Sequence, residues 1–176
     1  MNGGNKGFTL IELLVVAGLF GGLITLVTGI FIASLNVERN ILMTKKVLGE
    51  ISYSAEYMSR ALRMAQKDYL GLCIGESNSY ELTGRGGLKF VNALQDYKCQ
   101  EFYLDNGQIK TDIEGVVGDL TSSGITVDKL DFNISGASGT SDNLQPFVML
   151  YIESFAQKSS IIKVQTSVSQ RNPDIR

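Results

Sequence analysis

The sequence predicts an α+β fold in which one long N-terminal helix packs against an antiparallel β-sheet. Residues 13–35 contain no charged side chain, and no proline interrupts residues 8–67. Apolar residues then recur at helical spacing as far as residue 65. Beyond residue 69 the pattern changes to short apolar segments separated by polar turns, which is typical of strands.

The composition restricts the classes of protein that fit this chain. Its 176 residues are enough for one domain of ordinary size, and 16 basic against 18 acidic residues give a net charge of −2. Histidine, the commonest general base and metal ligand, is absent. We therefore expect no enzyme, no cofactor, no metal and no nucleic-acid partner.

The uncharged run is long enough to cross a membrane. As a helix its 23 residues would span about 34 Å, against about 30 Å for the bilayer core. Glu12 lies directly before this run. A carboxylate at the bilayer centre costs about 2.5 kcal/mol or more, so Glu12 needs a partner. A cut after Gly7 would place a positive amine on Phe8, four residues before Glu12.

Residues 7–16 (GFTLIELLVV) resemble the processing site and N-terminal helix of type IV prepilins and type II secretion pseudopilins. The resemblance implies that a prepilin peptidase cuts after Gly7 and that the new amine of Phe8 is methylated. It also implies that Glu12 guides assembly by pairing with an N-terminal amine. The expected fold is then pilin-like.

The resemblance also implies partners and a location. The partners are the prepilin peptidase, other pilin or pseudopilin subunits, the inner-membrane assembly platform and the membrane. The chain would cross the cytoplasmic membrane once with its C-terminal part exported, and would then enter a periplasmic or cell-surface filament. The function implied is that of a structural subunit of a type IV pilus or type II secretion pseudopilus.

Other interpretations of the N-terminus remain open. A secretory signal fits less well, since the apolar run is long and only Lys6 precedes it as a basic residue. A single-pass anchor for an extracytoplasmic binding or sensor module explains the run but not Glu12 or the junction of Gly7 and Phe8. A pilus adhesin or DNA-uptake receptor would keep the pilin-like N-terminus and bind a ligand through the exported part.

Two glycines in the run have the spacing of helix-pairing motifs. Gly18 and Gly22 form a G-x-x-x-G pattern, which lets membrane helices approach closely. Glycine is also common in membrane helices generally, so both explanations remain open.

The helix continues in amphipathic form after the apolar run. Its predicted apolar stripe consists of Leu48, Ile51, Ala55, Met58, Leu62 and Ala65. We expect this stripe to pack against the chain's own sheet and not against a partner coiled coil. The predicted segments are a leader (1–7), a transmembrane or filament-core helix (8–36), its amphipathic continuation (37–68), a β-rich globular domain (69–170) and a tail (171–176).

Seven strands are expected from alternation and turn signals. They cover residues 80–83, 88–91, 100–104, 108–113, 125–134, 147–153 and 161–169. Asn106-Gly107 predicts a tight hairpin, because both residues tolerate positive φ. The glycine-rich segment 84–87 lacks the Lys-Ser/Thr of a phosphate loop and is expected to form a turn.

Cys73 and Cys99 are the only cysteines. In an exported domain they are expected to form a disulfide, with two free buried thiols as the alternative. This pair lies well before the C-terminus, unlike the disulfide of many major pilins, and residues 165–171 loosely resemble minor subunits of the J or W kind. Both features favour a minor pilin or minor pseudopilin.

Two further clusters have a functional and a simpler explanation. The acidic set Asp128, Asp131, Asp142 and Asn143 suggests calcium, but its spacing matches no EF-hand loop, and solvated carboxylates are expected. The basic and aromatic set suggests contact with DNA, but interspersed acids favour a solvated sheet face. That second set consists of Arg85, Lys89, Lys98, Lys110, Tyr97, Phe102 and Tyr103.

Overall fold

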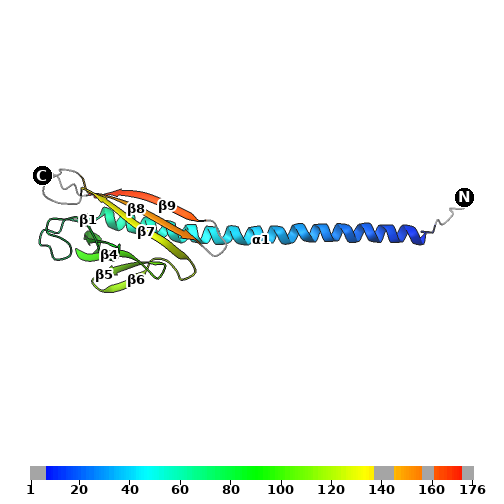
Figure 1. Ribbon diagram of the computed structural model, residues 1–176, viewed down its shortest axis with the longest axis horizontal. Coiled ribbons are helices and arrows are strands. Elements are labelled where there is room, and N and C mark those ends of the chain that lie inside the picture. The colour runs from blue at the N-terminus through cyan, green and yellow to red at the C-terminus, as the bar shows by residue number, and fades with distance from the viewer. Residues whose placement is uncertain (1–6, 137–144, 156–160, 172–176) are drawn as a thin grey trace. The chain divides into compact units, whose positions relative to one another are not determined.

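The computed structural model describes residues 7–136, 145–155 and 161–171. One long helix precedes a β-rich region, which confirms the predicted α+β, pilin-like arrangement (Figure 1). The chain divides into two compact units, one ending at Leu42 and one beginning at Met43, called the head below. The elements in order are α1 (Leu10–Arg63), β1 (Ala65–Gln66), β2 (Glu81–Leu82), β3 (Leu88–Asn92), a 3₁₀ turn η1 (Ala93–Gln95), β4 (Lys98–Asp105), β5 (Gln108–Ile113), β6 (Val116–Asp119), β7 (Thr126–Ser135), β8 (Phe147–Phe155) and β9 (Ile162–Ser169).

The part of α1 in the head buries one face, as the amphipathic pattern predicts. Ile51, Met58 and Leu62 have no exposed surface. The start of the predicted stripe is wrong, because Val47 is buried and Leu48 remains 47% exposed. Both residues lie within one turn before Ile51, at i−4 and i−3, so helical spacing alone does not distinguish them.

The helix ends at Arg63, earlier than the predicted boundary at residue 68. Four donors from other parts of the head bond to the carbonyl groups of residues 62–65, at the end of the helix and directly after it. The Tyr80 hydroxyl donates to the carbonyl of Leu62 at 2.7 Å, and the Arg171 N–H donates to that of Arg63 at 2.8 Å. The other two bonds run from Ala93 N to Met64 O and from Gln170 Nε2 to Ala65 O. The chain after Arg63 therefore leaves the helix and pairs with β3 as β1.

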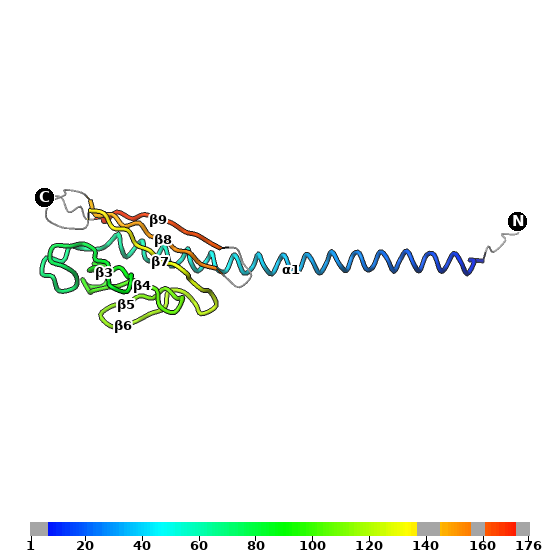
Figure 2. The backbone as a smooth tube through the Cα atoms, viewed as in Figure 1, coloured from blue at the N-terminus to red at the C-terminus, as the bar shows by residue number. Residues whose placement is uncertain are grey.

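The strands form two antiparallel sheets and not the single sheet that we expected. One sheet has the order β1-β3-β4-β5-β6, with β2 also paired to β3, and the other has the order β7-β8-β9. Figure 2 traces β3 through β6 on one side of the head and β7 through β9 on the other. The two sheets meet where the Val127 N–H of β7 donates to the carbonyl of Gly107, in the β4–β5 turn, at 2.9 Å.

Both predicted turns are confirmed. Asp105 pairs with Gln108 across a two-residue loop, and Asn106 and Gly107 have φ values of 50° and 75°, as a type I′ turn requires. Residues 84–87 connect β2 to β3. Each expected strand overlaps a strand of the structure, whereas β1 and β6, with two and four residues, were not predicted.

A line of buried polar side chains crosses the larger sheet. Asn92 Nδ2 donates to Gln100 Oε1 at 2.6 Å, and Gln100 Nε2 donates to Thr111 Oγ1 at 2.8 Å. The three side chains come from β3, β4 and β5 and are diagonal neighbours, because Gln100 pairs directly with Phe90 on β3 and with Ile113 on β5. Because buried amides without partners are costly, this line favours one register of the three strands.

A single hydrophobic core is shared by the helix and both sheets. The larger sheet contributes Phe90 and Phe102, whose ring centroids are 5.6 Å apart, and the smaller sheet contributes Leu150 and Ile152. Polar contacts also connect the loop between β6 and β7 to the helix. The Glu50 carboxylate accepts hydrogen bonds from the N–H and the hydroxyl of Ser122, each at 2.9 Å.

A matched pair of truncations tests the orientation of α1 in the head. Ile51→Ala removes a fully buried side chain and is expected to lower the free energy of unfolding by about 2–5 kcal/mol. Leu48→Ala, at a half-exposed position, is expected to cost less than about 1 kcal/mol. Thermal unfolding of the full-length protein in detergent, followed by near-UV circular dichroism, measures both losses. Equal losses would contradict the observed burial of this face.

Candidate functional site

The predicted assembly residues lie at the start of α1. Gly7 and Phe8 precede the helix, and Phe8 is 79% exposed. Thr9 caps the first turn: its carbonyl accepts from the N–H groups of Glu12 and Leu13 at 3.1 and 3.2 Å. Its Oγ1 accepts from the Glu12 N–H at 3.4 Å.

This cap is a feature that the sequence interpretation missed. Thr9-Leu10-Ile11-Glu12 has the T-x-x-E pattern of a capping box, so the signal was present in the sequence. The cap gives Glu12 a local role at the positive end of the helix dipole. The Glu12 carboxylate remains exposed and forms no salt bridge within the described residues.

The helix before the head has an apolar surface that nothing within its own unit covers. No residue of α1 before Val47 is buried. Within the described residues, α1 meets the length and composition requirements of a helix that crosses a membrane. This segment is a candidate membrane anchor. Its exposed large side chains include Leu10, Ile11, Leu13, Leu14, Leu19, Phe20, Leu23, Leu26, Ile30 and Phe31.

The predicted packing glycines have open space beside them. A Cβ added at Gly18 or at Gly22 would meet no atom within 4 Å, so the fold of this chain does not require glycine there. The Thr25 hydroxyl donates to the Gly22 carbonyl at 2.8 Å, and the Thr28 hydroxyl donates to the Ile24 carbonyl at the same distance. These hydroxyls therefore need no polar partner from outside the helix. The helix surface at Gly18 and Gly22 is thus suitable for close packing against another helix.

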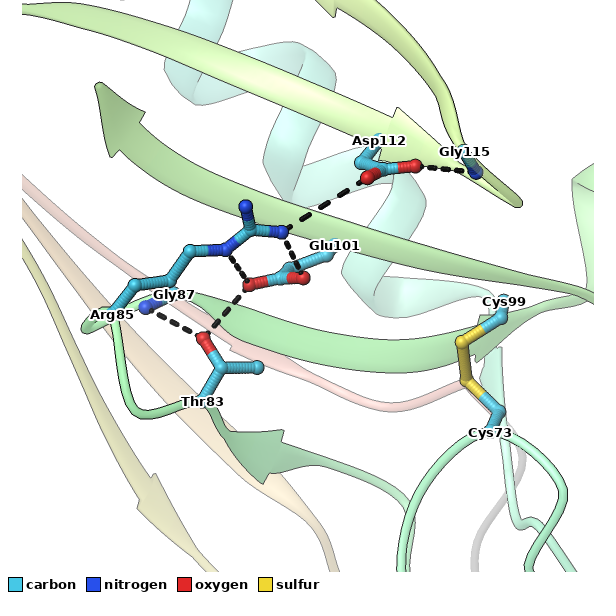
Figure 3. A network of polar contacts seen from close by, with 8 residues as sticks. All are labelled: Cys73, Thr83, Arg85, Gly87, Cys99, Glu101, Asp112 and Gly115. Atoms are coloured by element: carbon cyan, nitrogen blue, oxygen red, sulfur yellow. Dashed lines mark hydrogen bonds and ion pairs between the residues drawn. A yellow bond between two sulfur atoms is a disulfide. The ribbon is translucent and has the colours of Figure 1, made fainter. Parts of the chain in front are cut away.

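The predicted cysteine pair is bonded. Cys73 and Cys99 form a disulfide with their Cα atoms 5.4 Å apart, which excludes two free thiols (Figure 3). It joins the loop after β1 to the start of β4 across 26 positions. On the chain-entropy model, closing a loop of this length stabilises the fold by about 3–4 kcal/mol.

A buried carboxylate organises the same loop. Asp68 accepts hydrogen bonds from the N–H groups of Cys73, Ile74 and Leu70 at 2.6, 3.0 and 3.2 Å. Burial acts to raise the pKa of Asp68, but these backbone donors together outweigh it and hold the pKa below its ordinary value of 3.8. The ionised carboxylate is therefore part of the folded loop.

The suggested DNA-contact residues are mostly engaged within the head. Arg85 Nε donates to Glu101 Oε1 at 2.7 Å and its Nη2 pairs with Oε2, while the guanidinium lies over the Tyr103 ring, 3.6 Å from its centroid. Thr83 Oγ1 donates to Glu101 Oε1 at 2.8 Å (Figure 3). The hydrogen bond from Arg85 holds the pKa of Glu101 below its usual value despite burial, and raises that of Arg85.

Gly87 makes this network possible. A Cβ at this position would lie 2.6 Å from Glu101 Oε1 and 2.7 Å from the Phe102 carbonyl oxygen. The Gly87 N–H donates to Thr83 Oγ1 at 3.1 Å. Any side chain at this position would displace the Glu101 carboxylate, so glycine at position 87 allows the ion pair between Arg85 and Glu101 to form.

The other members of this set do not form a continuous cationic surface. Phe102 is fully buried, whereas Tyr97 is exposed. Lys98 lies 4.0 Å from Glu114, and Lys110 lies 3.4 Å from both Asp105 and Asp119. The absence of a nucleic-acid partner remains a prediction.

The suggested calcium residues are only partly described. Asp131 pairs with Lys129 at 2.6 Å, and Asp142 and Asn143 lie outside the described residues. Within residues 7–136, 145–155 and 161–171, no group of three or more His, Cys, Asp or Glu side chains has a geometry that could hold a metal ion. The leader before Gly7 and the tail after Arg171 also lie outside the described residues.

Comparison of the chain with protein-family models, with characterised proteins and with solved structures found no match. The class that the structure itself defines is an α+β protein with one long, apolar N-terminal helix and a disulfide-bonded β-rich head.

Replacing Asp68 tests its role in acid stability. Because its folded pKa lies below the unfolded value, the stability it contributes is present above pH 3.8 and is lost as the pH falls through the folded pKa. Asp68→Asn is expected to lower the free energy of unfolding at pH 7 by about 1–3 kcal/mol. The difference from the wild type should shrink as the pH falls below 3.8.

The measurement is thermal unfolding of both full-length proteins in detergent across this pH range. Glu101 also has a lowered pKa and contributes to the pH dependence of both proteins. The contribution of Asp68 is therefore the difference between the stability curves of the wild type and the Asn variant. A difference independent of pH would show that the carboxylate charge is not what organises the loop.

Proposed function

We propose that this protein is a structural subunit, of the minor class, in a type IV pilus or type II secretion pseudopilus. The observation that carries the proposal is an uncovered apolar helix with an exposed carboxylate, Glu12, in its first turn, directly after the Gly7–Phe8 junction. Such a helix needs lipid or other helices around it, and such a carboxylate needs a cation once water is excluded.

Cleavage supplies that cation. A prepilin peptidase cuts after Gly7, and the new amine of Phe8, then methylated, pairs with Glu12 of a neighbouring subunit. Removing one partner of a buried ion pair costs about 3–5 kcal/mol, so the pair selects one axial position between subunits. The membrane and the inner-membrane assembly platform hold the subunit before it joins a periplasmic or cell-surface filament.

The disulfide supports assignment to the minor class. Cys73–Cys99 fastens a loop early in the head, at the end of α1, and does not enclose a C-terminal region. A minor subunit is incorporated in few copies. The abundance of this chain in sheared filaments checks the assignment, and a dominant band would refute it.

Processing is the first expectation to test. In a host with a prepilin peptidase, the intact mass and N-terminal analysis should show a mature chain that begins at methylated Phe8. In a matched host without the peptidase, residues 1–7 should be retained. Retention in both hosts would exclude the pilin class and favour a static anchor for a binding or sensor module.

The second expectation to test is that the negative charge of Glu12 guides assembly. Glu12→Gln keeps the T-x-x-E/Q capping pattern but removes the negative charge, so it separates capping from pairing. We expect normal cleavage and methylation, with incorporation into filaments reduced at least tenfold, as the loss of a buried ion pair predicts. Glu12→Asp serves as the charge-preserving control. Normal incorporation of the Gln variant would show that no ion pair guides assembly.

A further inference from the structure

The outer strand of the smaller sheet has a regular edge that no described residue covers. β9 is the last strand in the order β7-β8-β9, and Figure 1 shows it at the margin of the head. Its eight residues pair with β8 without a register shift and contain no proline. An edge of this kind is a template for adding another strand.

The register identifies which backbone groups point outward. The Gln170 N–H donates to the Pro146 carbonyl at 3.1 Å, so this is a hydrogen-bonded position of the β8–β9 ladder. Such positions alternate along antiparallel strands, so Val168, Thr166 and Val164 bond to β8. The N–H and C=O groups that face away from β8 are those of Lys163, Gln165, Ser167 and Ser169.

The side chains beside this edge are incompletely covered. Ile162 and Val164 pack against the core but remain partly exposed, although their neighbours across β8 are fully buried. The charge at the edge is balanced, because Lys163 lies 3.5 Å from Glu153. An added strand would match both faces of the smaller sheet if it placed apolar residues beside Ile162 and Val164 on one face. On the other face it would place uncharged polar residues beside Gln165 and Ser167.

The other sheet edges in the described structure are less suited to pairing. β7 has a register shift between Val127 and Lys129, and its Val127 N–H is already bonded to Gly107. β6 has four residues, and β1 and β2 have two each. Short strands and bulges protect edges, and among the described strands β9 is the one outer strand of eight or more residues without a register shift.

We propose that β9 binds an extended strand from the head of a neighbouring filament subunit, in addition to the contacts of the N-terminal helix. This inference rests on the proposed function. An eight-residue edge about 26 Å long buries on the order of a few hundred Å² per partner, against about 800 Å² for a stable complex of free proteins. The contact is therefore too small to hold a dimer alone and requires a neighbour already held by its helix.

Photo-crosslinking of the full-length protein in the membranes of its own host tests this contact. One photoreactive residue replaces Ser167 at the β9 edge, and in a separate variant one replaces Leu19 in the apolar part of α1. We expect both positions to crosslink to a pilin-like subunit, and the product from Ser167 to map to a strand of that subunit.

A matched pair of variants tests whether the contact depends on an outward backbone N–H of β9. Gln165→Pro removes an outward N–H without removing a bond to β8, and Gln165→Ala keeps that N–H. The Pro variant should lower crosslinking from Ser167 about tenfold relative to the Ala variant, with crosslinking from Leu19 unchanged. Thermal unfolding in detergent checks that both variants fold, and if the Pro variant does not, the mapped crosslink from Ser167 alone decides.

The outcomes separate the two proposals. Crosslinks from Leu19 without any from Ser167, crosslinks from Ser167 only to lipid or to a protein that is not a subunit, or equal yields from folded Pro and Ala variants would overturn strand addition and leave the proposed function standing. No subunit crosslink from either position would overturn both.

Discussion

The packing of the head portion of α1 onto two sheets is the constraint on which the rest of the head depends. One face of the helix supplies Ile51, Met58 and Leu62 to a core that also contains Phe102 and Leu150 from the separate sheets. Neither sheet shares a ladder of strands with the other, but both contribute side chains to the core that this helix face enters. Close packing makes the position of each of these side chains depend on the others.

The end of α1 shows how the polar groups follow from that packing. The carbonyl groups of residues 62–65, at the helix end and directly after it, accept from four residues at widely separated positions in the sequence: Tyr80, Ala93, Gln170 and Arg171. The loop that follows is held by the Asp68 carboxylate and by the disulfide. These hydrogen bonds therefore connect the start of the larger sheet, and the residues that follow the smaller sheet, to the end of the helix.

The apolar part of α1 depends on a different constraint. Its backbone hydrogen bonds and the hydroxyls of Thr25 and Thr28 are satisfied within the helix, so it can exist in lipid or among other helices. Its side chains and the Glu12 carboxylate find no cover in the same unit. In the proposed filament, neighbouring subunits would provide both the apolar cover and the amine, and β9 would add a contact between heads.

Local patterns in the sequence alone determined the apolar helix, its amphipathic continuation, most of the strands and the Asn106-Gly107 turn, because each of these depends on residues close together in the chain. The capping signal at Thr9 was also local, although our interpretation overlooked it. Only the tertiary structure decided that Val47 and not Leu48 faces the core, that the helix ends at Arg63, and that the strands form two sheets. Those outcomes depend on hydrogen bonds and packing between distant segments, which periodicity along the chain does not encode.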